Sequence, residues 1–312
     1  MLTYLISGPV KSRVVDENWC EVIKSIAKEL KNRRSSNQLI VSTYPDEINE
    51  INGINGIKII INEDPGYDQD FYHIRNGIKL PRNTSRMLAT TFNGIKDINT
   101  DWCLRSRIEL LPDINHVEKH ISRIEELIQD LDKIKTGGAV FLTSNFHSSI
   151  TSRKGSILSF SDVFAIMRTE DIRELWETAQ KIYLEILNGN THPKHPLMNE
   201  QIIGQAYMKV FHDLYYKEFN SRYFFKKDLF MKELEVIVRK LIIVEADSLF
   251  IVKTRVSNGP SRSPKVPKNL RYRNILLIKF KFWRFISLAS KINHFGKFLL
   301  FSSKIKKTIY PR

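Results

Sequence analysis

The chain has 312 residues, a formal net charge of +15 and 42% hydrophobic residues, which is enough for one large domain or two small ones with an ample core. The charge lies at one end: residues 253–312 contain 16 Lys or Arg and no Asp or Glu, whereas the other 252 residues contain 33 basic and 34 acidic side chains. Because a fold that binds nucleic acid carries basic groups over its body, this nearly neutral body is not expected to bind nucleic acid.

The two cysteines, Cys20 and Cys103, are too far apart for a local metal motif and too few for a secreted disulfide framework. Residues 1–10 are apolar but lack the basic leading segment and the small-residue cleavage site of a signal peptide. No run reaches the roughly 18–20 apolar residues that span a bilayer. These features predict reduced thiols and a cytoplasmic protein.

Three short apolar runs, at residues 2–6, 39–42 and 57–61, are each followed by polar or turn residues and predict buried strands. Residues 18–34 repeat apolar side chains at helical spacing, which predicts a helix between the first two strands. This alternation favours an α/β sheet with a parallel core, whose ligands bind outside the carboxyl ends of the strands. The predicted binding rim consists of Ser7, Gly8, Pro9, Ser42, Thr43, Tyr44 and residues 62–66.

The rest of the chain continues the mixture of helices and strands. Helices are predicted over residues 84–98, 117–134, 160–187, 199–216 and 227–238, and strands over 102–104, 139–143 and 242–252. Residues 258–267 are rich in Ser, Pro and basic residues, which is typical of a linker. We therefore predict one domain of residues 1–252, a linker of residues 253–267 and a tail of residues 268–312.

The short motifs of several enzyme classes are missing. The chain contains no Gly-x-Gly-x-x-Gly, no P-loop, no His-Glu-x-x-His and no Gly-x-Ser-x-Gly. This argues against a dehydrogenase, an NTPase, a zinc protease and a standard α/β-hydrolase. The informative residues are polar groups at strand ends.

Two acidic side chains, Glu63 and Asp64, lie in the turn Asn62-Glu63-Asp64-Pro65-Gly66 directly after a predicted strand. Such carboxylates can hold a ribose, a base edge or a divalent cation. The alternative is a capped turn whose acids are only solvated.

Arg105, Arg107 and Glu109 alternate along a predicted strand end, so a period of two would point all three side chains the same way. Two guanidinium groups and a carboxylate suit a diphosphate with its Mg²⁺ or Mn²⁺. The alternative is an ion-pair ladder within the sheet.

Two further sites lie at predicted helix starts. Asn83 is a natural N-cap after Pro81, and a helix N-terminus favours anions, but a capped structural helix explains Asn83 equally well. Arg86 in the first turn opposes the helix dipole, which indicates a ligand or an acidic partner. Asp162 precedes a long apolar helix, where it serves either as a general base at a sugar hydroxyl or only as a capping acid.

Taken in order, these pieces resemble the WavE-type lipopolysaccharide-synthesis family, whose members are proposed glycosyltransferases. The resemblance covers about residues 1–250. Its matching residues are Ile6-Ser7-Gly8-Pro9, Ser42-Thr43-Tyr44, Asn62-Glu63-Asp64-Pro65-Gly66, Asn83-Thr84-Ser85-Arg86, Thr90-Thr91-Phe92-Asn93-Gly94-Ile95-Lys96, Arg105-Ser106-Arg107-Ile108-Glu109, Phe160-Ser161-Asp162-Val163-Phe164, Thr169-Glu170-Asp171, Leu175-Trp176 and Glu200-Gln201.

The resemblance implies a GT-A-like, Rossmann-like mixed sheet flanked by helices, which takes a nucleotide-activated sugar and works on bacterial surface polysaccharide. It also implies that the acid after Arg107 replaces the Asp-x-Asp carboxylate that holds a metal–diphosphate in GT-A enzymes. The family usually reads Lys-x-Arg-Thr/Ser-Asp at this point, whereas this chain has Ile108 and Glu109, and the Trp usual after Ser-Asp is Val163.

On this basis we predict a role for each candidate residue. Glu109 would bind the metal (Mg²⁺ or Mn²⁺) or the diphosphate, Arg86 and Arg107 would neutralise phosphate, and Asp162 would be the catalytic base. The predicted donor-binding set is Gly8, Pro9, Ser42, Thr43, Asp64, Asn83 and Arg105.

The tail from Leu270 interleaves basic residues with Ile, Leu, Phe and Trp283. This pattern is typical of a basic amphipathic helix on an anionic membrane surface, here the inner face of the cell membrane. The alternatives are a disordered basic extension and, less favoured because of the aromatics, nucleic-acid binding by the tail.

The predicted function is transfer of a sugar from a nucleotide-sugar donor to a lipid-linked or polysaccharide acceptor of lipopolysaccharide or capsule. A non-catalytic scaffold protein of a polysaccharide assembly complex is the alternative from another class. A phosphotransferase is the weaker alternative among enzymes.

Overall fold

The computed structural model describes residues 1–8, 19–45, 51–75, 78–134, 136–142, 163–188, 199–213, 236, 239–244 and 246–251, without the side chains of 69–82 and 200. The first half of the chain forms β1 (Leu2–Ser7), α1 (Trp19–Arg33), β2 (Gln38–Thr43), β3 (Ile57–Ile61), β4 (Asp68–Arg75), β5 (Ile78–Arg82), α2 (Thr84–Lys96), β6 (Trp102–Ser106) and α3 (Val117–Asp132). The second half forms β7 (Ala139–Leu142), β8 (Phe164–Arg168), α4 (Thr169–Leu187), α5 (Asn199–His212) and β9 (Leu241–Val244).

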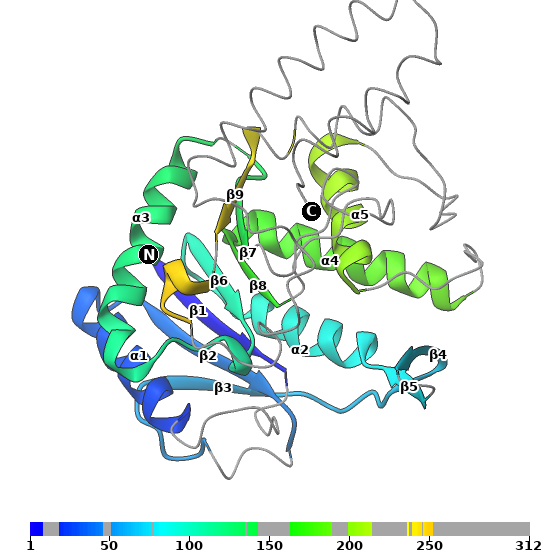
Figure 1. Ribbon diagram of the computed structural model, residues 1–312, viewed down its shortest axis with the longest axis horizontal. Helices are drawn as coiled ribbons and strands as arrows, with labels where there is room; N and C mark the ends of the chain where they lie inside the picture. Colours follow the sequence, from blue (N-terminus) through cyan, green and yellow to red (C-terminus); the bar gives the residue numbers. More distant parts are fainter. Residues whose placement is uncertain are drawn as a thin grey trace, which may run out of the picture.

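The centre of the fold is a seven-stranded mixed sheet with the order β3-β2-β1-β6-β8-β7-β9 (Figure 1). β3, β2, β1 and β6 are parallel, and β8 is antiparallel to β6 and β7. β9 is parallel to β7. β4 and β5 form a separate antiparallel hairpin. The predicted fold class, an α/β fold with a mixed sheet flanked by helices, is therefore confirmed.

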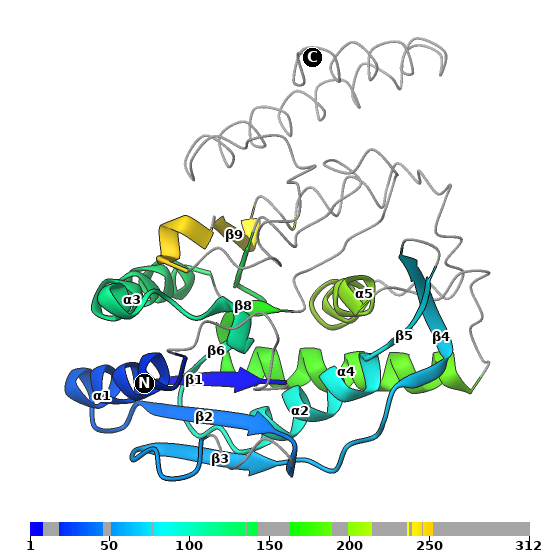
Figure 2. The ribbon, with the colours of Figure 1, turned by 60° about the horizontal axis from the view of Figure 1, so that its bottom comes forward.

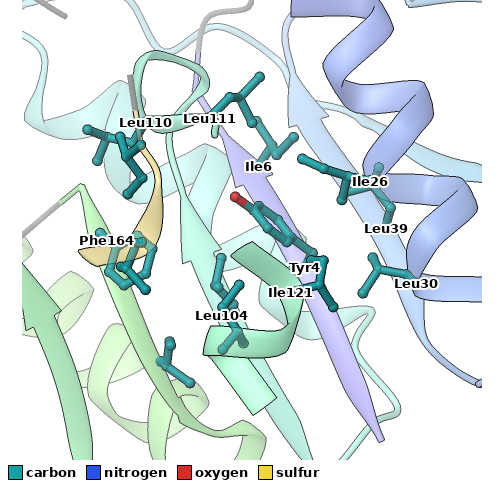
Figure 3. Packing of buried hydrophobic residues seen from close by; sticks show 14 of the residues in the cluster. Tyr4, Ile6, Ile26, Leu30, Leu39, Leu104, Leu110, Leu111, Ile121 and Phe164 are labelled. Atoms are coloured by element: carbon teal, nitrogen blue, oxygen red, sulfur yellow. The ribbon is translucent and has the colours of Figure 1, made fainter. Parts of the chain in front are cut away.

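The helices cover both faces of the sheet because the buried strands are apolar on both sides. Tyr4 and Ile6 of β1 pack in one core with α1 and α3 (Figure 3), whereas Leu5 between them packs in the other core with α2, α4 and α5. Successive side chains of a strand point to opposite faces, which explains this division. Figure 2 shows that the arrows of β1, β2 and β3 point towards the side where the hairpin β4–β5 stands.

Most predicted elements are confirmed, two are corrected, and one hairpin was missed. The predicted helix 160–187 is a strand, β8, followed by α4. Residues 163–167 are apolar and buried on both sides, and such a run gives no periodicity that separates strand from helix. The predicted strand 242–252 ends at Val244 and continues as a 3₁₀ turn, Ala246–Leu249. The hairpin β4–β5 was not predicted.

Several predictions concern residues outside the described part. These are Pro9, Asp162, most of the predicted helix 227–238, the linker 253–267 and the tail 268–312. None of the helices in the described ranges combines the length and apolar character needed to cross a membrane.

Helix α2 approaches the sheet closely at Gly94. A Cβ added there would lie 2.6 Å from Leu5 Cδ1 and 3.1 Å from Ser42 Cβ. Leu5 and Ser42 are both 0% exposed, so neither side chain has room to move aside. The missing side chain of Gly94 therefore sets the distance between α2 and the carboxyl ends of β1 and β2.

We expect Gly94→Ala to destabilise the fold by about 1–3 kcal/mol, because the added methyl group overpacks this contact. The sign of the stability change is informative, since Ala in a helix interior otherwise stabilises a protein by about 1 kcal/mol relative to Gly. Urea unfolding of the two proteins measures the difference. A variant as stable as the wild type would contradict this close packing.

Candidate functional site

The carboxyl ends of four parallel strands meet at one edge of the sheet. Gly8 N donates to Ser42 O at 3.0 Å, and Asn62 N donates to Thr43 O at 2.8 Å. Ile6 of β1 pairs with Ser106 of β6, which brings the end of β6 to the same edge. The structure thus confirms that the segments predicted to form the rim come together, as far as the described residues extend.

Gly8 makes the turn out of β1 at this edge. Its φ of +110° lies in the region that favours glycine, so the residue type matches the backbone there. Its neighbour on β2, Ser42, donates from Oγ to Thr90 O at 2.6 Å and is buried, as is Thr43. Ser42 and Thr43 therefore belong to the buried layer under the rim, where Ser42 ties β2 to α2.

Asn62 joins β3 to the neighbouring strand and to α2. Its Nδ2 donates to Ser42 Oγ and to Thr43 O, both at 2.9 Å. Its Oδ1 accepts from Asn93 Nδ2 at 2.9 Å. Because Asn62 is 2% exposed and its amide is engaged at both ends, it fixes the start of the turn that carries Asp64.

Arg86 and Asp64, predicted separately from distant motifs, form an ion pair. Arg86 Nη2 lies 2.6 Å from Asp64 Oδ2, and Asp64 Oδ1 accepts from Gly66 N at 2.9 Å. The Arg86 guanidinium lies over two rings, with Cζ 4.6 Å from the centroid of Tyr44 and 4.8 Å from that of Tyr67. The acidic partner expected for Arg86 is therefore Asp64.

The charge of Arg86 is stabilised in this setting. Burial acts to lower the pKa of Arg86, but the nearby Asp64 carboxylate and the Tyr44 and Tyr67 phenol groups outweigh it, so the pKa is raised. The guanidinium is thus a fixed cation at the rim. Its planar face is covered by aromatic rings, an arrangement that Arg tolerates better than Lys.

The N-terminus of α2 is occupied by a carboxylate of the protein. Asn83 is the N-cap residue by position, but its side chain makes no capping hydrogen bond. Asp68 accepts from Thr84 N at 2.8 Å and from Ser85 N and Oγ instead. The prediction that Asn83 caps this helix is therefore wrong, and Asp68 caps it instead. An anion bound at this helix end would compete with Asp68.

Arg105 is a core residue and is not exposed at the rim. Its side chain is 1% exposed and runs under α2, where Nε donates to Ser7 Oγ at 2.9 Å and Nη2 to Thr91 Oγ1 at 3.2 Å. Its guanidinium also lies 5.1 Å from the Trp176 ring of α4. Arg105 therefore supports the end of β1 from inside the core.

Arg107 and Glu109 form their own pair at the end of β6. The chain leaves the extended conformation after Arg107 and turns into a 3₁₀ helix, Ile108–Leu110, so the predicted period of two does not continue. Arg107 Nη2 lies 2.6 Å from Glu109 Oε1. The side chain of Arg107 is 24% exposed and that of Glu109 only 7%. The two residues therefore pair within one turn of the chain. They do not form the alternative ion-pair ladder within the sheet.

The rim thus carries two ion pairs, one after β3 and one after β6. Between these strands lie β2 and β1, so the pairs start about 14 Å apart at the usual strand spacing. β8 is antiparallel and begins at this edge, with Phe164 beside Ser106. Asp162, two residues before Phe164 in the sequence, lies outside the described residues.

The described residues contain no group of three or more His, Cys, Asp or Glu able to hold a metal ion. Glu109 offers one carboxylate, which is buried and already paired with Arg107. These residues therefore do not form a complete metal site of their own.

The model of the family described as WavE lipopolysaccharide synthesis matches residues 2–248. The chain belongs to this family. Among curated proteins, no sequence matches the chain significantly. The match to the WavE family confirms the resemblance predicted from the ordered motifs.

Solved structures resemble this WavE-family chain in part. The 4-diphosphocytidyl-2C-methyl-D-erythritol synthase from Anaerococcus prevotii is 11% identical, with a TM-score of 0.37 over 76% of this chain and 98% of that chain. CMP:2-keto-3-deoxy-manno-octonic acid synthetase complexed with CTP is 11% identical, with a TM-score of 0.33 over 61% and 86%. The galactosyltransferase LgtC is 11% identical, with a TM-score of 0.32 over 66% and 70%. The assignment rests on the family match alone.

Sequence reasoning placed Tyr44 on the rim of this WavE-family protein without a role and missed Tyr67 and Asp68. Tyr44 is 1% exposed, and its Oη donates to Arg86 O at 2.8 Å. Tyr67 and Asp68 could have been found from their position in the sequence. They directly follow the Pro65-Gly66 turn, next to the predicted rim residues 62–66.

Proposed function

We propose that this WavE-family chain is a nucleotide-sugar-dependent glycosyltransferase that adds a sugar to a growing bacterial surface polysaccharide, either lipopolysaccharide or capsule. The observation that carries the proposal is the family match over residues 2–248, on a chain whose rim holds two Arg–carboxylate pairs. Arg binds phosphate oxygens in bidentate fashion, and a nucleotide sugar presents two phosphates.

We assign the two pairs to different parts of the donor, because they start about 14 Å apart. Asp64 and Arg86, after β3, would take the nucleoside with its adjoining phosphate. Arg107 and Glu109, after β6, would take the phosphate that bears the sugar. Arg107 is the catalytic cation in this proposal, because negative charge grows on that phosphate as its bond to the sugar breaks. Gly8, with its backbone at the centre of the rim, lets the donor approach closely.

The reaction breaks the bond between the sugar's anomeric carbon and the diphosphate oxygen. It forms a bond from that carbon to an acceptor hydroxyl oxygen. The hydroxyl proton passes to a base, for which Asp162 is the proposed residue, and the nucleoside diphosphate leaves with the bonding electrons. Holding donor and acceptor in line supplies a further part of the rate.

A divalent cation would neutralise the leaving diphosphate. The described residues do not hold a metal by themselves, so we propose only that Glu109 would contact Mg²⁺ or Mn²⁺ that arrives with the donor, which supplies oxygen ligands of its own. Chelator should then leave the melting temperature of the donor-free protein unchanged.

We place the protein on the cytoplasmic face of the inner membrane, held there by the basic tail of residues 268–312. At about 1 kcal/mol for each basic residue near an anionic surface, several residues together give stable binding. Fractionation of cells that express the chain without residues 268–312 tests this location. Recovery of the shortened chain with the membranes would contradict it.

Incubation of the purified chain with a panel of nucleotide sugars and membrane-derived acceptor tests the function. We expect one donor to release its nucleoside diphosphate together with labelled glycan. Asp162→Asn should lower this transfer without weakening donor binding measured by calorimetry, since a base acts on the acceptor. Failure of every donor to bind would contradict the proposal, and full activity of Asp162→Asn would remove that residue from the mechanism.

A non-catalytic scaffold protein is the second candidate. Glu109 is buried and already paired with Arg107, and Ile108 stands where the family usually has Thr or Ser. In that case a Glu109→Ala chain would still assemble with its polysaccharide complex, and neither it nor the wild type would bind a donor. Loss of donor binding in Glu109→Ala alone favours the enzyme.

A further inference from the structure

The aromatic ring of Tyr67 is exposed to solvent, and hydrogen bonds hold the residues on either side of it. The ring belongs to a residue that is 54% exposed at the carboxyl edge of the sheet. On one side Gly66 N is bonded to Asp64, and on the other Asp68 accepts from Thr84 N at 2.8 Å. A single exposed aromatic residue is common, but here the neighbours on both sides are held by hydrogen bonds, so the ring is offered at a defined place.

The inner face of this ring is covered by a cation. Arg86 Cζ lies over both rings, 4.8 Å from the Tyr67 centroid and 4.6 Å from the Tyr44 centroid, and we call these three side chains the Tyr44–Arg86–Tyr67 stack. The stack is anchored at its buried end, where Tyr44 is 1% exposed and bonded to Arg86 O. At its other end Tyr67 is 54% exposed, and we call the ring face turned away from Arg86 its outer face.

The components of the stack match the parts of a nucleotide. The π-face of a base stacks on aromatic side chains, Arg is suited to phosphate oxygens, and the Asp64 carboxylate accepts hydrogen bonds from hydroxyl or amine groups. A neutral sugar would also stack on a ring, but it has no anion for Arg86. The neighbouring cation therefore favours a nucleotide over an acceptor glycan.

We propose that the outer face of Tyr67 is the stacking site for the base of a nucleoside diphosphate, with Arg86 on the adjoining phosphate. This inference rests on the proposed glycosyltransferase function and assigns the base-binding end of its donor site. Arg86 covers one face of Tyr67, and the base would cover the other.

Calorimetric titration of the full chain with UDP, CDP, GDP, ADP and inorganic pyrophosphate tests this site. Stacking of a base on an aromatic side chain contributes about 1–3 kcal/mol, so Tyr67→Ala should weaken binding of the preferred nucleoside diphosphate about 5- to 150-fold. Pyrophosphate has no base, so its affinity should be unchanged. Tyr67→Phe keeps the ring and should bind both probes like the wild type.

Two results would overturn the stacking site. Unchanged nucleotide affinity in Tyr67→Ala shows that the base lies elsewhere, and an equal loss for nucleotide and pyrophosphate shows that Tyr67 only holds Arg86 in place. Both leave the proposed transferase function intact, because the wild type still binds nucleotide. Absence of nucleotide binding in the wild type contradicts the function and the site together.

Discussion

Replacing Arg107 with methionine is expected to lower the rate of sugar transfer by about 10²- to 10³-fold, the usual effect of removing one group that stabilises charge in a transition state. Arg107 lies at the end of β6, and its Nη2 reaches Glu109 Oε1 at 2.6 Å. Methionine keeps most of the side-chain length but removes the charge. Single-turnover measurement of nucleoside diphosphate release, with the donor saturating, reads the chemical step.

Loss of Arg107 also leaves Glu109 without its cation while its side chain is only 7% exposed. Such an unpaired buried group costs about 1–3 kcal/mol of stability. The double variant Arg107→Met/Glu109→Gln removes that charge and should recover stability without recovering transfer. Recovery of both would mean that the single variant failed through its fold and that Arg107 plays no part in the reaction.

The matched control is Arg33→Met. Arg33 pairs with Glu29 of its own helix at 2.7 Å and bridges α1 to α3 through Glu125 at 2.9 Å. Its removal should cost stability at the level of partly exposed ion pairs, about 1 kcal/mol or less. Transfer by the folded Arg33→Met protein should equal that of the wild type.

The rim could be predicted from the sequence because it follows from local information. Residues 2–6, 39–42 and 57–61 are apolar runs with turn residues behind them, and parallel strands place their carboxyl ends together. The observed pairing of Ser7 with Ser42 and of Thr43 with Ile61 fulfils that expectation. The same reasoning placed Asp64 and Arg107 at one edge of the sheet.

The contacts within the rim could not be predicted, because they depend on how segments fold back on each other. Asp68 caps α2 because the hairpin β4–β5 returns the chain to residue 84, and that hairpin gave no signal that was recognised. Arg105 was expected to face a ligand together with Arg107. Arg105 pairs with Leu5 in the sheet, and its side chain lies under α2, where it reaches Thr91. The position of α2 depends on how the whole helix packs on the sheet, which the local sequence does not determine.

His120 of α3 was not singled out by the sequence, yet it ties two distant parts of the fold together. Its ring is 0% exposed, and Nδ1 lies 2.6 Å from Leu249 O, beyond β9. A carbonyl oxygen only accepts, so Nδ1 carries the proton of the neutral ring. Nε2 then accepts from Tyr4 Oη at 3.3 Å, and burial raises the pKa of Tyr4, which keeps that phenol protonated as a donor.

The neutral state of His120 makes the fold sensitive to acid. Burial lowers the pKa of His120 from 6.5 to about 4, against the hydrogen bond to Leu249 O, which acts to raise it. Between these two values the unfolded chain binds a proton and the folded chain does not, so protons favour unfolding. The stability that His120 contributes is complete above pH 6.5 and is lost as the pH falls to about 4.

The difference between the two pKa values corresponds to about 3 kcal/mol, a large part of the stability of a domain. Urea unfolding at about pH 7 and about pH 4.5 should show this loss in the wild type. His120→Asn keeps a donor near the Nδ1 position and has no titrating group, so it should be less stable at neutral pH but lose clearly less stability on acidification.

The control for His120 is His116, a neighbour on the same segment whose side chain is 42% exposed. His116→Asn should keep the acid-induced loss of the wild type, because His120 is still present. An equal loss in His120→Asn and the wild type would show that other groups cause the acid sensitivity. With the expected result, protonation of a single buried ring would weaken the contact between α3 and residues 246–251.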